Sequence, residues 1–254
     1  MNFKTTVLSV VALCFLVSCA ATSKAQKDKQ YDCSERLETV KKRMSKKNHT
    51  DAVRILDDIK YHCGGSAFMD SVYYYGGIAN FRMKQYTDAR IEFERLSREF
   101  PRSPFVEEAQ YRVGQMIYLQ SNPFDRDQTE TKEAVYYFNT FLERFGSGNY
   151  ADSARHHISL CKEKLAKKEL KNALFYHKQK QHEAALVYFK SLLSQYPESK
   201  YINEARVYMV EALLDLKRSD EAQEIFKDLD SSGFGEKLKE KFDFVKTRLD
   251  ASSK

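Results

Sequence analysis

Three residues of this chain have the types and spacing to suggest a catalytic or metal site: His156, His157 and Cys161. Adjacent side chains on a helix point about 100° apart, so the two histidines cannot bind one metal ion from the same face. Cys161 falls on an apolar helical face, which disfavours the reactive thiolate. The HExxH motif, the GxSxG motif and a phosphate-binding glycine loop are all missing from the sequence. The sequence therefore predicts no enzyme, no cofactor and no metal site.

A different cysteine carries a chemical signal near the N-terminus. Leu16-Val17-Ser18-Cys19 ends an apolar run that begins at Val7. This arrangement resembles a bacterial lipobox, after which the signal peptide (residues 1–18) is removed and Cys19 is acylated on its sulfur and its amine. We expect a covalent lipid such as palmitate on Cys19, and Ala20 points to the outer membrane, with the chain facing the periplasm. The alternative is an ordinary secretory signal in which Cys19 is incidental.

The composition indicates a helical protein with a solvated surface. The 254 residues include only 9 Gly and 4 Pro, and few helix breakers over this length indicate long helices. The formal net charge is +6, with Lys and Glu interleaved along the chain. A nucleic-acid partner is not expected, because Lys and Arg would then be clustered. Residues 19–32 are predicted to be a lipidated tether, whose polar residues 20–32 would reach about 43 Å when extended.

One pattern recurs five times along the rest of the chain: a small residue, a large apolar residue four positions later and another three beyond that. The small residues are Ala52, Ala89, Ala134, Ala185 and Ala222, and the large residues that follow are Leu56, Phe93, Phe138, Phe189 and Phe226. These offsets place the residues on one helical face. Gly77 and Ala173 lie twelve positions before the small residues Ala89 and Ala185, which we call the anchors of their repeats. Small residues at these positions indicate a preceding helix that packs closely against the anchor helix.

The pattern resembles the tetratricopeptide repeat, a pair of antiparallel helices. We expect an all-α fold, an α-solenoid of five tetratricopeptide-like helix pairs plus a C-terminal capping helix. The solenoid is predicted over residues 33–250, with repeats at about 33–64, 67–101, 104–146, 149–197 and 200–233 and the capping helix at 236–250.

Two repeats contain extra residues of different character. Ser121-Asn122-Pro123-Phe124-Asp125-Arg126-Asp127 is polar and predicts a loop between the two helices of the third pair. Residues 149–196 contain neither Gly nor Pro, which predicts a lengthened helix over about 150–179, roughly 45 Å long.

Cys33 and Cys63 open and close the first predicted helix pair. In an antiparallel hairpin those two ends lie side by side, so we expect a disulfide between them. Neither cysteine has a CxxC partner, which argues against zinc. Closing this loop would contribute about 3 kcal/mol by the chain-entropy model.

The block from Asp125-Arg126-Asp127-Gln128-Thr129 to Tyr196-Pro197-Glu198-Ser199 is similar in order and spacing to the BamD family. That family comprises tetratricopeptide lipoproteins of the outer-membrane β-barrel assembly machinery. The similarity is densest between residues 121 and 201. Two departures are Phe145-Gly146, where the family usually has Tyr-Pro, and Phe175-Tyr176-His177 in place of Phe-Tyr-Tyr.

The resemblance implies a non-enzymatic scaffold with several partners. These are the POTRA region of a BamA-like barrel-forming subunit, other assembly lipoproteins, unfolded outer-membrane protein precursors, and the membrane through the lipid. The partner-binding residues are then expected to be Arg126, Asp127, Gln128, Tyr176 and Tyr188. An alternative is another outer-membrane tetratricopeptide lipoprotein that scaffolds cell-wall or Tol-linked proteins, because a fold alone does not fix a function.

Tyrosines in the first half of the solenoid are candidates for contact with precursor peptides. They are Tyr73, Tyr74, Tyr111 and Tyr118. Tyrosine offers a large amphipathic surface at low entropic cost, and stacked helix pairs form an extended concave surface. For any one of these tyrosines, filling the core between repeats is the favoured alternative. The loop residues Arg126, Asp127 and Gln128 could equally form the turn and the helix cap before Thr129.

Overall fold

The computed structural model describes residues 31–252, and within that range it contains eleven α-helices and no strand. Cys19, the signal segment (residues 1–18) and the tether up to residue 30 lie outside the described residues. Among the helices of the described range, none is both long enough and apolar enough to cross a bilayer. The predicted all-α class is confirmed.

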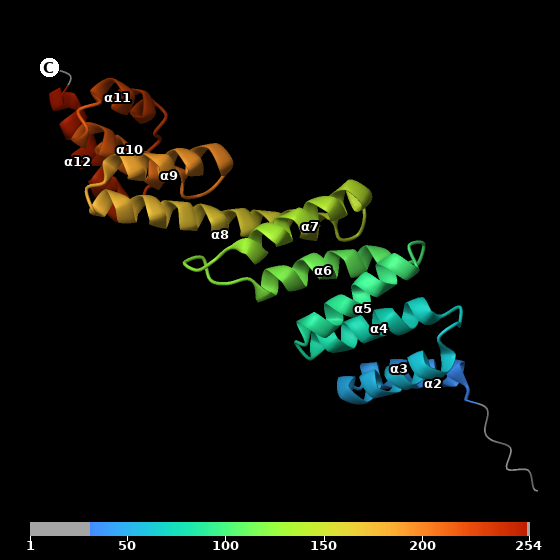
Figure 1. Cartoon of the computed structure of the whole chain (residues 1–254). Coiled ribbons are helices and arrows are strands. Elements are labelled where there is room, and N and C mark those ends of the chain that lie inside the picture. The colour runs from blue at the N-terminus through green and yellow to red at the C-terminus, as the bar shows by residue number, and fades with distance from the viewer. Residues whose placement is uncertain (1–30, 253–254) are drawn as a thin grey trace, which may run out of the picture.

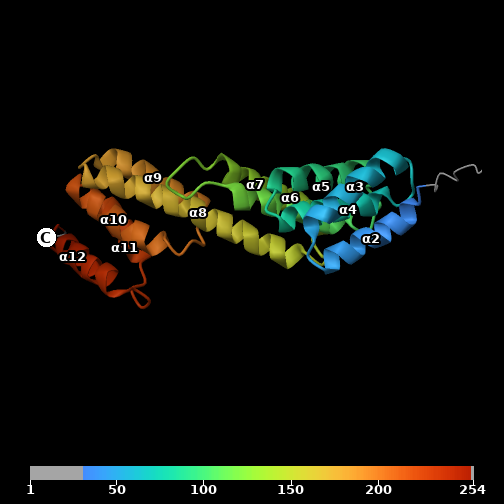
Figure 2. The same ribbon diagram turned by 90° about the horizontal axis from the view of Figure 1, so that it is seen from below.

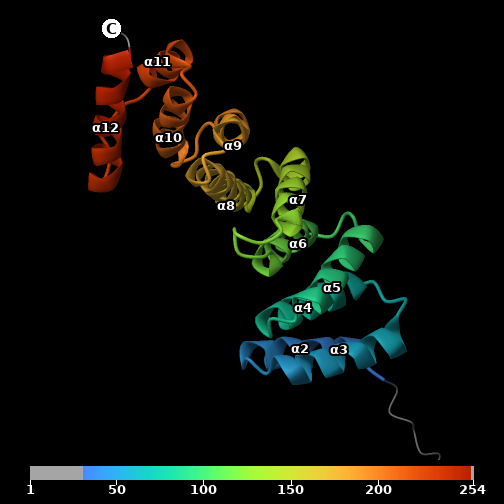
Figure 3. The same cartoon turned by 60° about the vertical axis from the view of Figure 1, so that its left-hand side comes forward.

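The helices follow one another as five pairs and a final single helix (Figure 1). The pairs are α2 (Cys33–Ser45) with α3 (His49–Cys63), α4 (Met69–Arg82) with α5 (Tyr86–Glu99), α6 (Val106–Gln120) with α7 (Thr129–Phe145), α8 (Ala151–Lys178) with α9 (His182–Gln195), and α10 (Ile202–Asp215) with α11 (Ser219–Lys227). The last helix, α12 (Glu236–Ser252), contacts α10 and α11. Figure 3 shows the pairs as successive layers, with α2 and α12 at opposite ends. The predicted solenoid with a capping helix is therefore confirmed.

Small residues allow the two helices of a pair to approach closely. The ring of Phe93 on α5 lies over Gly77 of α4, and a Cβ placed on Gly77 would lie 2.5 Å from Phe93 Cε1. Gly114 of α6 faces Phe138 of α7 in the same way, at 2.9 Å. The sequence expectation of close approach at Gly77 is confirmed, and the reason is steric: no side chain fits between backbone and ring.

A lysine in the left-handed conformation forms the turn in four of the five pairs. The four lysines are Lys47, Lys84, Lys180 and Lys217, with φ between 59° and 62°. Each precedes the small anchor residue of its repeat by five positions. The third pair has no such turn, because the inserted loop at residues 121–128 replaces it. The pattern of small and large residues does not by itself predict this shared turn.

The long helix α8 joins two hydrophobic cores. Ala154, Ile158 and Cys161 belong to the first core, which extends through α2 to α7. Ala166, Leu170 and Ala173 belong to the second core, which extends through α9 to α12. Figure 2 shows α8 running lengthwise between the two groups of helices. The predicted long helix is confirmed, and its continuity fixes the position of one core relative to the other.

The first helix pair is closed by a covalent bond. Cys33 and Cys63 form a disulfide with their Cα atoms 6.2 Å apart. Asp32 caps the start of α2, where its side chain accepts hydrogen bonds from the backbone N–H groups of Ser34 and Glu35 at 2.9 and 3.0 Å. This pair is the N-terminal end of the solenoid, so it packs against a neighbouring pair on one side only. The helix cap and the disulfide therefore stabilise the repeat that has the fewest packing contacts.

Candidate protein-binding site

The loop at residues 121–128 lies against α8 and is held there by lysines that project from one helical face. Lys164 donates to Ser121 Oγ at 2.8 Å and to the Ser121 carbonyl oxygen at 3.3 Å. One turn further along, Lys168 donates to the carbonyl oxygen of Arg126. Lys167 lies over the ring of Phe124, with Nζ 4.1 Å from the centroid, a cation–π contact. The loop is therefore a fixed feature of the surface of α8.

Gln128 organises this loop from the inside. It is buried, and its Nε2 donates to four backbone carbonyl oxygens of the loop, those of Asn122, Pro123, Arg126 and Asp127. Its Oε1 accepts from Thr131 Oγ1 at 2.8 Å. Three loop residues are predicted to contact a partner. One of them, Gln128, therefore positions the other two, Arg126 and Asp127. Arg126 and Asp127 are exposed, and Asp127 accepts from the backbone N–H of Thr129 at the start of α7.

The two tyrosines expected to bind a partner form one unit across α8 and α9. The rings of Tyr176 and Tyr188 are stacked, with centroids 5.3 Å apart and an interplanar angle of 9°. Phe175 and Val187, adjacent to them in the chain, are 58% and 66% exposed. We call these four residues the α8–α9 aromatic face. Phe175 also contacts Tyr176, with ring centroids 5.4 Å apart. Exposed apolar side chains beside a stacked aromatic pair are typical of a protein contact.

This face continues the side of α8 that carries the loop. Phe175 follows Lys171 by four residues and Lys168 by seven, which is the spacing of one helical face. Lys171 itself lies near the loop, with Nζ 3.8 Å from Asp125 Oδ2. The exposed loop residues and Phe175 therefore lie along one side of α8.

The tyrosines predicted to contact peptides divide into two classes. Tyr73 and Tyr111 are only 6% and 5% exposed and belong to the first core, so their burial argues against direct contact with a peptide. Tyr74 and Tyr118 are half-buried. The sequence alone does not distinguish the buried tyrosines from the half-buried ones. Neighbouring helical positions such as Tyr73 and Tyr74 differ only in the direction in which their side chains point.

Tyr74 is part of a polar network between α4 and α6. Its hydroxyl donates to Glu108 Oε2 at 2.8 Å, and Arg112 donates to Glu108 Oε1 at 2.8 Å. Burial alone would raise the pKa of Glu108, but the hydrogen bonds from Arg112 and Tyr74 lower it overall. Burial and this carboxylate together raise the pKa of Tyr74. Phe105 stacks on the Tyr74 ring at 4.3 Å, so the half-buried ring is held at both its face and its hydroxyl.

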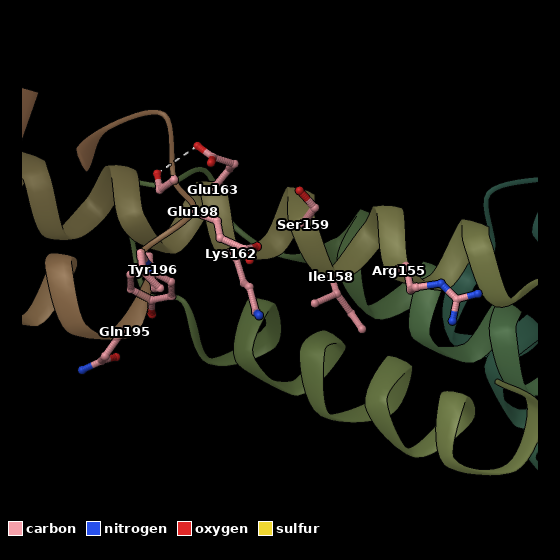
Figure 4. A pocket seen from close by; sticks show the side chains of 10 residues that line it. Arg155, Ile158, Ser159, Lys162, Glu163, Gln195, Tyr196 and Glu198 are labelled. Atoms are coloured by element: carbon pink, nitrogen blue, oxygen red, sulfur yellow. Dashed lines mark hydrogen bonds between the residues drawn. The ribbon is translucent and has the colours of Figure 1, made fainter. Parts of the chain in front are cut away.

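A groove of about 260 Å³ crosses the middle of α8 (Figure 4). Its walls are α8, from Arg155 to Glu163, and the segment 195–199 that leads from α9 to α10. Glu163 fixes this segment by accepting from Ser199 Oγ at 3.2 Å and from the backbone N–H of Lys200 at 3.1 Å. The groove lies where the two hydrophobic cores meet, and its lining is mostly polar.

A larger groove of about 500 Å³ opens between α5 and α7. Arg98 of α5 and Tyr137 and Phe141 of α7 contribute to its lining, with Val113 of α6 between them. Its mixture of aromatic and polar groups suits an extended peptide. No feature of the sequence indicated this groove, because its lining residues come from three helices.

Two of the three residues first considered for catalysis, His157 and Cys161, are used in packing. Cys161 is buried, and burial raises the pKa of its thiol to about 12. His157 contacts the rings of Tyr111, Tyr118 and Phe138, and its Nδ1 lies 2.9 Å from the carbonyl oxygen of Ser153. His156 is exposed. The thiol is therefore not activated as a nucleophile.

Comparison with known proteins agrees with this scaffold geometry. Residues 29–229 match the model of the YfiO family, described as "Outer membrane lipoprotein". The chain is 26% identical to the outer membrane protein assembly factor BamD of Pasteurella multocida over 183 residues, which cover 68% of this chain and 70% of that protein. It is 22% identical to BamD of Buchnera aphidicola over 244 residues, covering 89% and 97%.

Among solved structures the chain is similar to YrrB, described as a TPR protein with an unusual peptide-binding site. The identity is 16% and the TM-score 0.41, over 92% of this chain and 98% of that one. The family match covers far more than half of the residues, including every helix from α2 to α11. This chain belongs to the YfiO family of outer membrane lipoproteins, the family that the BamD resemblance indicated.

Proposed function

We propose that this chain is a non-enzymatic scaffold in outer membrane protein assembly, anchored by a lipid on Cys19 and facing the periplasm. It binds the POTRA region of a barrel-forming subunit and engages unfolded outer-membrane precursors. The observation that carries this proposal is the family match over residues 29–229. The assembly-factor names of the relatives support it, as does the arrangement of two packed cores on one continuous helix.

The POTRA region binds along α8, at the exposed loop residues Arg126 and Asp127 and at the α8–α9 aromatic face. Two features support this location. The loop is held rigidly on α8 by Lys164 and Lys168, so little conformational entropy is lost when a partner binds there. Phe175 and Val187 offer exposed apolar surface, and large apolar side chains surrounded by polar groups are typical of interface anchors.

Unfolded precursors bind to the N-terminal core, at the half-buried tyrosines Tyr74 and Tyr118. Both are held by neighbours, Tyr74 by Glu108 and Tyr118 by a cation–π contact with Lys164, whose Nζ lies 5.7 Å from the ring centroid. A second location is the groove between α5 and α7, which is favoured by its larger volume and by the accessible side chains of Tyr137 and Thr140 in its lining.

A crosslinking map separates these two locations. A photoreactive residue is placed at position 74, 118, 137 or 140 in turn, and each variant is irradiated with a peptide from the C-terminal strand of a barrel precursor. Crosslinks at positions 74 and 118 support binding at the two tyrosines, whereas crosslinks at positions 137 and 140 support binding in the groove between α5 and α7. A crosslinker at exposed Tyr61, on α3, is the matched control for non-specific capture.

Affinity purification of the detergent-solubilised native chain tests the function itself. The proposal predicts recovery of a POTRA-bearing barrel protein together with other assembly lipoproteins. Recovery of cell-wall enzymes or Tol-linked proteins alone would instead support the alternative, an envelope scaffold of another pathway. Lipid on Cys19 is tested separately by mass spectrometry of the N-terminal peptide. A Cys19→Ser variant is expected to leave the membrane fraction.

A further inference from the structure

Two histidines and one aspartate meet at the turn between α8 and α9. One nitrogen from each of His177 and His182 and one oxygen from Asp215 all lie within 4.8 Å of one another. The Nδ1 atoms of the two histidines are 3.2 Å apart, and His182 Nε2 lies 3.6 Å from Asp215 Oδ2. The three side chains come from α8, α9 and α10, so the fold and not a local motif brings them together.

The remaining polar atoms of His177 and Asp215 are held by other residues. His177 Nε2 lies 2.9 Å from Glu211 Oε2, and Glu211 Oε1 accepts from Lys241 at 2.6 Å. Asp215 Oδ1 accepts from Arg248 of α12 at 2.8 Å, which leaves Oδ2 directed to His182. A carboxylate on the far nitrogen of a histidine is the usual support of a metal-binding imidazole, because it fixes the ring and its tautomer.

The hydrogen-bonding capacity of this chain of groups points to a cation. With Nε2–H of His177 donated to Glu211, its Nδ1 carries a lone pair directed at His182. A neutral His182 has one N–H. If Nδ1 carries it, His182 Nε2 and Asp215 Oδ2 face each other as two acceptors at 3.6 Å; if Nε2 carries it, the two Nδ1 atoms do so at 3.2 Å. A cation in this cluster, either a second proton on His182 or a metal ion, removes the conflict in both cases.

We propose that His177, His182 and Asp215 bind one divalent transition-metal ion, with Zn²⁺ as the representative ion. Two imidazole nitrogens and one carboxylate oxygen, with a water in the fourth position, suit Zn²⁺, whereas Ca²⁺ and Mg²⁺ prefer sites made of oxygen. Tetrahedral bonds of about 2.0 to 2.1 Å separate ligand atoms by roughly 3.4 Å. The 3.2 Å between the two Nδ1 atoms is close to that value, and one ligand atom of each of the three side chains lies within 4.8 Å of the other two.

A metal here would clamp three helices of the second core. It would tie the turn at Lys180 to the end of α10, next to Tyr176 of the α8–α9 aromatic face. The site is independent of the proposed function, because it rests only on the geometry of these side chains. The sequence predicted no metal site, since His182 and Asp215 lie in different repeats and share no recognisable spacing.

Zn²⁺ binding to the purified full chain without an affinity tag tests the proposal. Equilibrium dialysis is expected to give one bound Zn²⁺ per chain, and Zn²⁺ should raise the thermal unfolding midpoint because it binds the folded state. Co²⁺ at the same site is expected to give the intense visible absorption of a tetrahedral ion. His182→Gln and Asp215→Asn should each weaken Zn²⁺ binding at least tenfold.

The matched control is His156→Gln, which changes an exposed histidine on the same helix as His177 and should leave the affinity unchanged. Circular dichroism of each variant shows that the helices are retained. The proposal is overturned if the wild-type chain binds no Zn²⁺ at tens of micromolar, or if His156→Gln lowers the affinity as much as His182→Gln does.

Discussion

Lys164 donates a hydrogen bond to Ser121 Oγ across 43 residues of sequence, at 2.8 Å. This contact joins the end of α6 to the middle of α8 and begins the row of lysines that holds the loop at residues 121–128. Because the loop carries Arg126 and Asp127, the proposed partner surface depends on lysines that need not touch the partner. The mechanical role of α8 and its recognition role are therefore linked.

Replacing Lys164 with Met tests this link, because Met keeps an apolar stem and removes the donor. We expect the free energy of unfolding to fall by about 1 to 2 kcal/mol, since the hydroxyl and carbonyl oxygens of Ser121 lose the hydrogen bonds that Lys164 donates. Limited proteolysis within residues 121–128 should become faster. Lys162→Met, two positions away and exposed, is the control. Equal effects of the two substitutions would show that the contact does not hold the loop.

Gly77→Ala tests the close approach of α4 and α5. A methyl group there would overlap the ring of Phe93, and Phe93 is fully buried, so it has little space in which to move. The expected loss is about 1 to 3 kcal/mol, measured by urea denaturation. Gly65→Ala adds the same group where no atom lies within 4 Å, and it should have little effect. An unchanged midpoint for Gly77→Ala would contradict the packing.

The reactivity of the cysteines can be counted directly. In the described part of the chain Cys161 is the free cysteine, and burial raises its pKa to about 12. The folded protein, purified from membranes, should therefore react very slowly with a thiol reagent at pH 8. After denaturation without reductant, one thiol should react. Three reactive thiols would show that Cys33 and Cys63 are not bridged and are free thiols like Cys161.

Glu108 should make stability depend on pH in the acid range. Its pKa in the folded chain is lower than the ordinary 4.5, because hydrogen bonds from Arg112 and Tyr74 outweigh the effect of burial. A lowered carboxyl pKa stabilises the fold above the unfolded-state pKa, and this contribution disappears as the pH falls through the folded-state value. The stability difference between wild type and Glu108→Gln should therefore shrink from pH 6 to pH 3. A constant difference would argue against this ionised network.

Helical periodicity in the sequence was enough to predict the pairs, the long α8 and the close contact at Gly77. These features depend on residues three to five positions apart, or on the spacing of repeats, so a linear pattern contains them. The antiparallel arrangement of α2 and α3 likewise brings Cys33 and Cys63 together.

The environment of single side chains could not be predicted in the same way. Tyr73 is buried and Tyr74 half-buried, although they are adjacent, because the position of α5 and α6 decides which one is covered. Gln128 belongs to a polar loop by sequence, yet its amide points inward to four carbonyl groups. The approach of His182 to Asp215 depends on how α10 packs against α9, which no local pattern records.

Binding between the purified chain and the isolated POTRA region of the barrel-forming subunit from the same bacterium decides whether this chain is a scaffold for that subunit. We expect a stable complex that Phe175→Asp together with Val187→Asp weakens at least tenfold, because charge would enter the α8–α9 aromatic face. Tyr61→Asp, at an 85% exposed position on α3, should leave the affinity unchanged. If the wild-type chain does not bind, or if the paired substitutions leave the affinity unaffected, the POTRA region does not dock on the α8–α9 aromatic face.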